Sequence, residues 1–263
     1  MAPPSERELA AIEQSQLDWA VLMEAEVRED PELGVTLIRH HGNRPDFNLT
    51  ARVRWPAGEV PQRLEALRER MEAEGVWPQM VISEWLSEPD DLAARVEAAG
   101  WKQVRGERIM FTRHAPVVPH IDPGMRVEAV TAASAIDAAR LEAEAFGPPV
   151  DGVEARAELL AKLVQSGAIR GFLLRLVHEP VATLRLTPGD RVAGIHGVAV
   201  AARHRRRGYG RMITAVATRA GLATGHGLVW LSVDEDNSAA YDLYRGLGYE
   251  PSFAWSRWLA PAR

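Results

Sequence analysis

The sequence predicts an α+β fold in which two consecutive domains each have a twisted, mostly antiparallel sheet flanked by helices. Segments of helical periodicity alternate with short β-rich segments along the chain. Three prolines fall within residues 116–123, and proline disfavours helix at the residue before it. Both halves also end alike, as "LAARVEAAGW" and "AYDLYRGLGY" show: helix, glycine, aromatic residue. We therefore expect domains at 1–115 and 124–263, joined by a linker at 116–123.

The first half begins with a predicted helix over residues 5–28. Ser5 and Glu8 have the spacing of a capping box, which marks a helix start. The periodicity then predicts strands at 34–40, 47–55 and 78–86, helices at 59–74 and 88–100, and a strand or hairpin at 101–113. Glycines follow both of these later helices, as is common after a helix end.

The second half has a similar order of elements. The pattern predicts helices at 132–146 and 153–165, strands at 171–177, 181–186 and 191–200, a helix at 208–224, a strand at 228–233, a helix at 238–247 and closing strands in 249–259. "HEP" and "TPGD" separate the first three strands and contain residues typical of turns, so those strands should form antiparallel hairpins.

Composition narrows the protein class. The chain has 46% hydrophobic and 25% charged residues, as soluble globular proteins do, and no apolar run long enough to span a membrane. It begins without the basic and apolar regions of a signal peptide, so we expect a cytoplasmic protein that does not bind membranes. The absence of cysteine excludes disulfides, zinc–thiolate sites and cysteine nucleophiles. The histidines show no ligand spacing, so we expect no metal.

Charge is distributed unequally. The net charge is −7 up to residue 115 and +2 from residue 116 onward. Nucleic-acid-binding domains are usually strongly basic, so we expect no nucleic-acid partner. The basic second half still allows a local anion site.

The stretch "HRRRGYGR", residues 204–211, is the best candidate for that anion site. It lies between a predicted strand and a predicted helix, where free backbone N–H groups and the helix dipole attract anions. Gly208 and Gly210 remove side chains where a phosphate would approach the backbone. The stretch therefore predicts a pyrophosphate-binding turn, the alternative being a basic loop with a glycine-assisted helix start. Neither the P-loop string nor the full dinucleotide fingerprint occurs in the chain.

Two motifs in the second half resemble those of a known family. Arg205-x-x-Gly208-x-Gly210, which follows "GVAV", resembles the acetyl-CoA motif of the GNAT acyltransferase superfamily. About 30 residues later, "NSAAYDLYRGLGYE" resembles the second signature of the same family. The resemblance covers roughly residues 124–260. The first half has "RWPAGEVPQRLEAL" at the corresponding place and lacks the motif, so it is similar to a degenerate GNAT-like domain. An unrelated α+β domain is the alternative.

The resemblance implies a set of acetyl-CoA contacts. In the family, the strand before the motif splays from its neighbour and pantetheine pairs with its backbone, here at Val198 and Val200, which flank Ala199. The backbone N–H groups that would hold the pyrophosphate belong to Arg206, Arg207, Gly208, Tyr209, Gly210 and Arg211. Arg205 occupies the motif position. The side chains of Arg203, Arg206 and Arg207 would be rim charges near the adenosine 3′-phosphate. Asn237 would contact pantetheine, cap the next helix, or do both.

The resemblance also implies catalytic residues. Tyr244 matches the family tyrosine whose hydroxyl faces the thioester sulfur, and its spacing to "GLGY" favours it over Tyr241. Protein-lysine-acetylating members carry a glutamate base at the position of Gly194, so this chain departs from them. His196 is two residues further on, hence on the same strand face, and its imidazole is a candidate base. The other candidates are the carboxylates at 234 and 235 and a water relay.

These observations predict an N-acyltransferase. We expect direct transfer from acetyl-CoA to the amine of a small-molecule or peptide acceptor in a ternary complex, without a covalent enzyme intermediate. The alternatives are a non-catalytic acyl-CoA-binding or regulatory protein and a nucleic-acid-binding module built on "RHRRRGYGR". Family acceptor pockets lie near the segment that reads "EAEAFGPPVDGVEAR" here, which carries no interpretable code. Acceptor, acyl length and the choice between monomer and homodimer remain open.

Overall fold

A computed structural model describes residues 2–41, 47–120 and 123–262. The chain forms two compact units that interleave along the sequence. The C-terminal unit comprises Met1–Ser15, Met110–Ser232 and Asn237–Pro251, and the N-terminal unit comprises Gln16–Ile109, Val233–Asp236 and Ser252–Arg263. Two residues of the predicted linker, Ile121 and Asp122, lie outside the described residues. The boundaries at 115 and 124 remain predictions.

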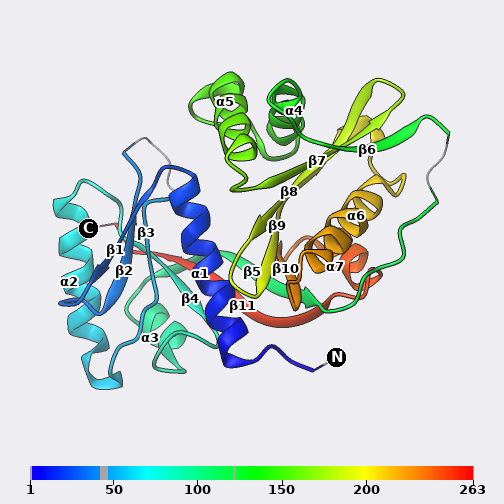
Figure 1. Cartoon of the computed structure of the whole chain (residues 1–263). Helices are drawn as coiled ribbons and strands as arrows, with labels where there is room; N and C mark the ends of the chain where they lie inside the picture. Colours follow the sequence, from blue (N-terminus) through cyan, green and yellow to red (C-terminus); the bar gives the residue numbers. More distant parts are fainter. Residues whose placement is uncertain (1, 42–46, 121–122, 263) are drawn as a thin grey trace. The chain divides into compact units, whose positions relative to one another are not determined.

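Within residues 2–41 and 47–120, the first half of the chain forms three longer helices and five strands (Figure 1). They are α1 (Glu6–Leu22), β1 (Glu26–Asp30), β2 (Val35–Arg39), β3 (Leu49–Ala51), α2 (Val60–Ala73), β4 (Gln79–Ser83), α3 (Leu92–Ala98) and β5 (Lys102–Thr112), with a 3-10 turn at Ala57–Glu59. In the N-terminal unit the strand order is β1-β2-β3-β4-β11, where β11 is Glu250–Leu259.

Two expectations for this half need correction. The predicted helix at 5–28 ends at Leu22, because Glu24 adopts a left-handed φ of 66° and the chain then enters β1. Only Leu49–Ala51 of the predicted strand at 47–55 is a strand, and Arg52, with a φ of 52°, follows it directly. Of the two alternatives predicted for residues 101–113, the structure has the single strand, over Lys102–Thr112.

The hydrophobic residues of the N-terminal unit divide between the two faces of its sheet. Leu37 of β2 and Met80 of β4 belong to a buried cluster with α2 and α3. Their neighbours Ile38 and Val81 instead pack with Leu17 of α1. The alternation follows from the two-residue repeat of a strand and places helices over both faces.

The second half contains the elements that the sequence predicts and one more strand. They are β6 (Met125–Ala129), α4 (Ala135–Phe146), α5 (Gly152–Gln165), β7 (Arg170–Leu176), β8 (Glu179–Pro188), β9 (Val192–Val200), α6 (Tyr209–Ala223), β10 (Leu228–Asp234), α7 (Ser238–Arg245) and β11, with a 3-10 turn at Ala202–His204. The additional strand, β6, is only partly buried, and its apolar–polar alternation extends over only five residues. Helices α4 and α5 lie on one side of β7–β9, and α6 and α7 lie on the other (Figure 1).

The two units repeat one strand arrangement. In the N-terminal unit β1, β2 and β3 pair antiparallel, and β3 pairs parallel with β4. In the C-terminal unit β7, β8 and β9 pair antiparallel, and β9 pairs parallel with β10. The chain therefore contains the predicted duplicated fold.

The helix ends repeat as well. Gly100 follows α3 with a φ of 86°, and Gly248 follows α7 with a φ of 85°. In each case the next residue, Trp101 or Tyr249, donates its N–H to a carbonyl five residues earlier. This is the Schellman geometry, which requires a residue that tolerates positive φ. It explains the shared glycine–aromatic pair that the two halves show in sequence.

The predicted capping box is present at the start of α1. The Ser5 N–H donates to Glu8 Oε2 at 2.8 Å, and Arg113 donates to the same oxygen at 2.8 Å. The hydrogen bond from Arg113, followed by those from Ser5, lowers the pKa of Glu8 from 4.5 to about 2, against the opposing effect of burial. Because the folded-state pKa is depressed, this stabilisation is present above about pH 4.5 and is lost as the pH falls towards 2.

We expect Glu8→Gln to lower the free energy of unfolding at pH 7 by up to about 3 kcal/mol. The loss should shrink as the pH falls below 4, because wild-type Glu8 then becomes protonated. Urea unfolding at pH 7 and pH 3 measures both values, with Glu6→Gln, an exposed position in the same helical turn, as the control. An equal loss at both pH values would contradict the assigned role of the Glu8 charge.

Candidate functional site

The turn between β9 and α6 has the backbone shape of an anion site. Arg206 and Gly208 both adopt left-handed conformations, with φ of 63° and 84°. Such conformations turn successive N–H groups towards one side and form a concave nest. The first helical hydrogen bond runs from the N–H of Met212 to the carbonyl of Gly208, at 3.0 Å. The N–H groups of residues 208–211 therefore have no acceptor within the helix. The turn thus presents several N–H groups at the positive end of α6.

Glycine is suited to the two motif positions, 208 and 210, for different structural reasons. A Cβ atom at Gly208 would have no atom within 4 Å, so the space in front of this residue is open. A Cβ atom at Gly210 would lie 3.3 Å from Leu243 Cδ1 and 3.5 Å from Val200 Cγ2. Gly210 therefore allows α6 to pack closely against β9 and α7, while Gly208 leaves room for a ligand.

Several basic side chains of the motif hold the turn in place. Arg203 and His204 both pair with Glu179 of β8, at 2.8 Å from Arg203 Nε and 2.7 Å from His204 Nε2. Arg205 Nε donates to the carbonyl of Val200 at 3.3 Å, and Arg211 donates to the carbonyl of Gly246 after α7 at 2.6 Å. These contacts fix the start of α6 to β8, β9 and α7.

Arg206 and Arg207 differ from their neighbours. Both are exposed, and neither forms an ion pair within the described ranges. Their charges are thus available to a ligand at the rim of the turn. The Tyr209 side chain, in contrast, is buried, with its ring 5.9 Å from that of His204. Only the backbone of Tyr209 faces the open turn.

Strand β9 leaves its parallel neighbour before reaching this turn. Its pairing with β10 ends at Ile195 and Leu231, although β9 continues to Val200. On its other edge the register with β8 shifts, so that β9 contains one extra residue near Gly197, which has a φ of 62°. A bulge with a left-handed glycine bends a strand and interrupts its ladder. The backbone at residues 198–200 is thereby unpaired with β10 and leads into the nest.

His196 is enclosed beside the bulge. Its Nε2 lies 2.9 Å from Thr187 Oγ1, and its ring meets Trp230 edge-on at 5.3 Å. Burial, and secondly the charge of Arg185, lower the pKa of His196 to about 3, so the imidazole is neutral at physiological pH. A Cβ atom at Gly194 would lie 2.6 Å from His196 Nε2. The imidazole therefore occupies the space that a side chain at position 194 would enter.

Helix α7 supplies a buried phenol and a capped start. Tyr244 is 6% exposed, and burial raises its pKa to about 12, so its hydroxyl remains protonated at physiological pH. Its ring lies 6.0 Å from that of Tyr249. Asn237 Oδ1 accepts the N–H of Ala240 at 3.1 Å, which is the capping arrangement expected from the sequence. Leu243, next to Tyr244, touches the α6 start at Gly210, as the distances above show.

The two alternative carboxylate bases belong to the N-terminal unit. Asp234 pairs with Arg105 at 2.7 Å, and the N–H of Glu235 donates to the carbonyl of Gly106 at 3.0 Å. Asp234 is therefore engaged by a cation within its own unit.

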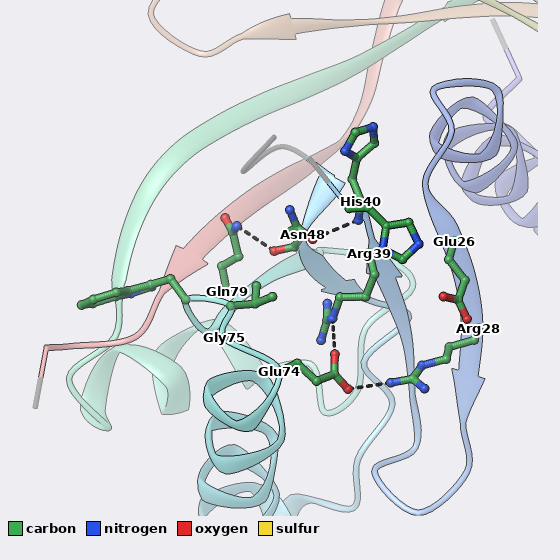
Figure 2. Close-up of a pocket in the computed structure, with 11 residues that line it drawn as sticks. Glu26, Arg28, Arg39, His40, Asn48, Glu74, Gly75 and Gln79 are labelled. Carbon is green, nitrogen blue, oxygen red and sulfur yellow. Dashed lines mark hydrogen bonds and ion pairs between the residues drawn. The ribbon is translucent and has the colours of Figure 1, made fainter. Parts of the chain in front are cut away.

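The N-terminal unit also has a polar pocket near the end of α2 (Figure 2). Glu74 links Arg28 and Arg39 there at 2.6 and 2.7 Å, and Gln79 donates to the carbonyl of Asn48 at 2.7 Å. A CoA-binding turn would instead lie at the other end of α2, about 20 Å away by the rise of the helix. The pocket is thus no counterpart of the nest at α6.

A known protein family matches part of the second half of the chain. Residues 138–249 match the family model described as the Acetyltransferase (GNAT) family. This segment is a GNAT domain. No functionally curated protein matches the chain. The GNAT segment contains β9, the nest, α6, β10 and α7, and so includes the candidate site.

Solved structures extend the comparison to the whole fold. A GCN5-related N-acetyltransferase from Kribbella flavida superposes with a TM-score of 0.73 and 23% identity, covering 96% of this chain and 95% of that one. A tandem GNAT protein of the clavulanic acid biosynthesis pathway superposes with a TM-score of 0.61 and 18% identity, over 79% and 72% of the two chains. At these identities the likeness concerns the fold, which is that of tandem GNAT proteins.

Neither a metal-binding cluster nor a membrane-spanning helix is found in the described part of the chain. Its histidines and carboxylates form no group of three that could hold a metal ion. None of its helices combines the length and apolarity needed to cross a membrane.

Some site features could not be predicted from the motifs alone. Glycine inside a strand is a known sign of a bulge, so Gly197 carried a usable signal. The left-handed backbone of Arg206 carried none, because arginine has no preference for it. The partner of Arg203 and His204, Glu179, lies about 25 residues away and follows only from the folded structure.

Proposed function

We propose that the protein is an N-acyltransferase that moves an acetyl group from acetyl-CoA to an amine. The observation that carries the proposal is the unpaired edge of β9, which leads directly into the N–H nest at α6. This arrangement supports binding of an extended amide chain that ends in a pyrophosphate. Membership of residues 138–249 in the GNAT family supports acetyl transfer as the chemistry.

The cofactor contacts follow from that geometry. We assign pantetheine to the backbone at Val198 and Val200, around the buried Ala199, where β9 lacks its parallel partner. We assign the pyrophosphate to the N–H groups of residues 206–211, with the open space at Gly208 in front of it. Arg206 and Arg207 are placed to meet further phosphate charge. Arg205 acts by holding the turn to Val200.

Acetyl-CoA supplies an activated thioester, whose carbonyl carbon bonds to the amine nitrogen as the carbon–sulfur bond breaks. The departing sulfur takes up negative charge, and the attacking nitrogen must lose a proton. We assign Tyr244 to the sulfur side because it matches the family tyrosine that faces the thioester sulfur, and its protonated phenol is able to donate. Asn237, as the cap of α7, helps to position this helix.

His196 is our candidate on the proton-accepting side. Its imidazole is neutral and fills the space beside Gly194, where lysine-acetylating members of the family carry a glutamate. Its pKa of about 3 makes it a weak base, since an efficient base has a pKa near the working pH. We therefore propose that His196 orients the proton transfer and that the acceptor amine arrives unprotonated, with a water relay as the alternative.

We propose that only the second half, residues 124–263, binds the cofactor. The corresponding turn before α2 is a 3-10 segment followed by Pro61 and has no left-handed residue pair.

The acceptor would be a small molecule or a peptide, and we propose a cytoplasmic location and either a monomer or a homodimer. The competing function is a non-catalytic acyl-CoA-binding or regulatory protein. Such a protein requires the nest but does not require a phenol that donates to a departing sulfur.

Gly208→Ala should weaken CoA binding at least about tenfold while the fold persists. The added methyl group would enter the space assigned to phosphate. Gly225→Ala is the matched control, because Gly225 also has positive φ (91°) and no atom within 4 Å of an added Cβ, but follows the other end of α6. Calorimetric titration with CoA gives the affinities and the number of sites. Equal losses in both variants, or two equivalent sites per chain, would contradict the assigned cofactor site.

The activity itself is tested by acetyl-CoA turnover with amino acids, polyamines, aminoglycosides and peptides as acceptors. With an acceptor found, Tyr244→Phe should reduce kcat about 100-fold and leave CoA affinity nearly unchanged. The hydroxyl is expected to matter most in the transition state. Tyr241→Phe, on the same helix, should change kcat little. Equal small effects in both variants would favour the non-catalytic alternative.

A further inference from the structure

A buried ion-pair cluster lies behind the bulge of β9. Glu142 of α4 pairs with Arg185 of β8 through Oε1 and with Arg156 of α5 at 3.3 Å through Oε2. Glu142 and Arg185 are only 7% and 6% exposed. Burying charged side chains costs desolvation free energy unless they are paired, so a cluster of this kind indicates a specific role.

The Arg185 guanidinium lies against the bulge itself. A Cβ atom at Gly197 would lie 2.6 Å from Arg185 Nη2, 3.0 Å from Cζ and 3.1 Å from Nη1. The guanidinium group therefore occupies the space that a side chain at position 197 would enter. The register of β8 and β9 shifts at this same place, since Arg185 is opposite His196 and Thr183 is opposite Ala199. Arg185 thus fills the site where the ladder is interrupted.

Arg185 also faces His196. The groups packed around this imidazole are Thr187 of β8 and Trp230 of β10, both uncharged, and the charged members of the cluster, Arg185 and, behind it, Glu142. Arg185 is the positive charge that, after burial, lowers the pKa of His196. One side chain therefore contacts the bulge and acts on the neighbouring candidate base.

We propose that Arg185 is a positioning residue that Glu142 orients: it holds the β9 bulge open at Gly197 and directs its positive charge towards His196. Glu142 lies on α4 and begins the segment "EAEAFGPPVDGVEAR", near which the acceptor pockets of the family lie. The inference rests on the proposed function, because it gives a reason for holding residues 198–200 away from a strand partner. Arg185 acts through the backbone and through His196 and is not assigned a contact with substrate.

The test separates the charge of Arg185 from its shape. Arg185→Met removes the charge, and Arg185→Lys keeps the charge but loses the planar group. In Arg185→Met the NMR titration midpoint of His196 should rise by about one pH unit, and in Arg185→Lys it should stay near the wild-type value. In both variants the amides of residues 197 and 198 should exchange with solvent about tenfold faster in the ligand-free protein.

Arg156→Met is the matched control, because it removes the other arginine of Glu142 and does not touch Gly197. It should change neither the His196 titration nor the exchange of the bulge amides. Equal effects in Arg156→Met and Arg185→Met, or no effect in folded Arg185→Met, would overturn the proposal. If Arg185→Met does not fold, Arg185→Lys still tests the bulge by exchange. All readouts use ligand-free protein, so a failure to bind CoA would count against the proposed function alone.

Discussion

Strand β9 hydrogen-bonds to β10 only as far as Ile195, and the features of the site depend on this early separation. A continuous parallel ladder to Val200 would use up the backbone groups that an extended ligand needs. The extra residue at Gly197 bends the strand while its other edge remains paired with β8. The early end of a single ladder thus creates an accessible strand edge inside an otherwise ordinary sheet.

The remaining elements turn that edge into a directed site. Glu179 fixes Arg203 and His204 just beyond β9, and Arg211 ties the first turn of α6 to the end of α7. The nest is therefore held on both sides by side chains of its own motif. Of the cations in "HRRRGYGR", only Arg206 and Arg207 are left for a ligand within the described part of the chain. In the folded protein, the cationic run therefore separates into side chains that hold the turn in place and side chains that are available to a ligand.

Sequence reasoning succeeded where local physics decides the structure. The Schellman glycines, the capping box at Ser5 and the helix that begins after Gly208 all follow from backbone preferences over a few residues. It failed at β1 and β6. Strand β1 is charged, mostly exposed and without apolar alternation, whereas β6 alternates over only five residues directly after the proline-rich segment. The cluster around Glu142 could not be predicted from the sequence either. Its members lie on three elements, and no local pattern indicates that they meet.

Hydrogen exchange with and without CoA measures whether β9 and the nest bind one ligand together. We expect CoA to slow exchange at residues 198–200 and at 206–211, and to leave residues 56–61 before α2 unchanged. The first group would gain strand-like partners, and the second would gain phosphate oxygens. Protection at 56–61, or the absence of protection along β9 under saturating CoA, would contradict the claim that the open strand edge and the nest form one acyl-CoA site.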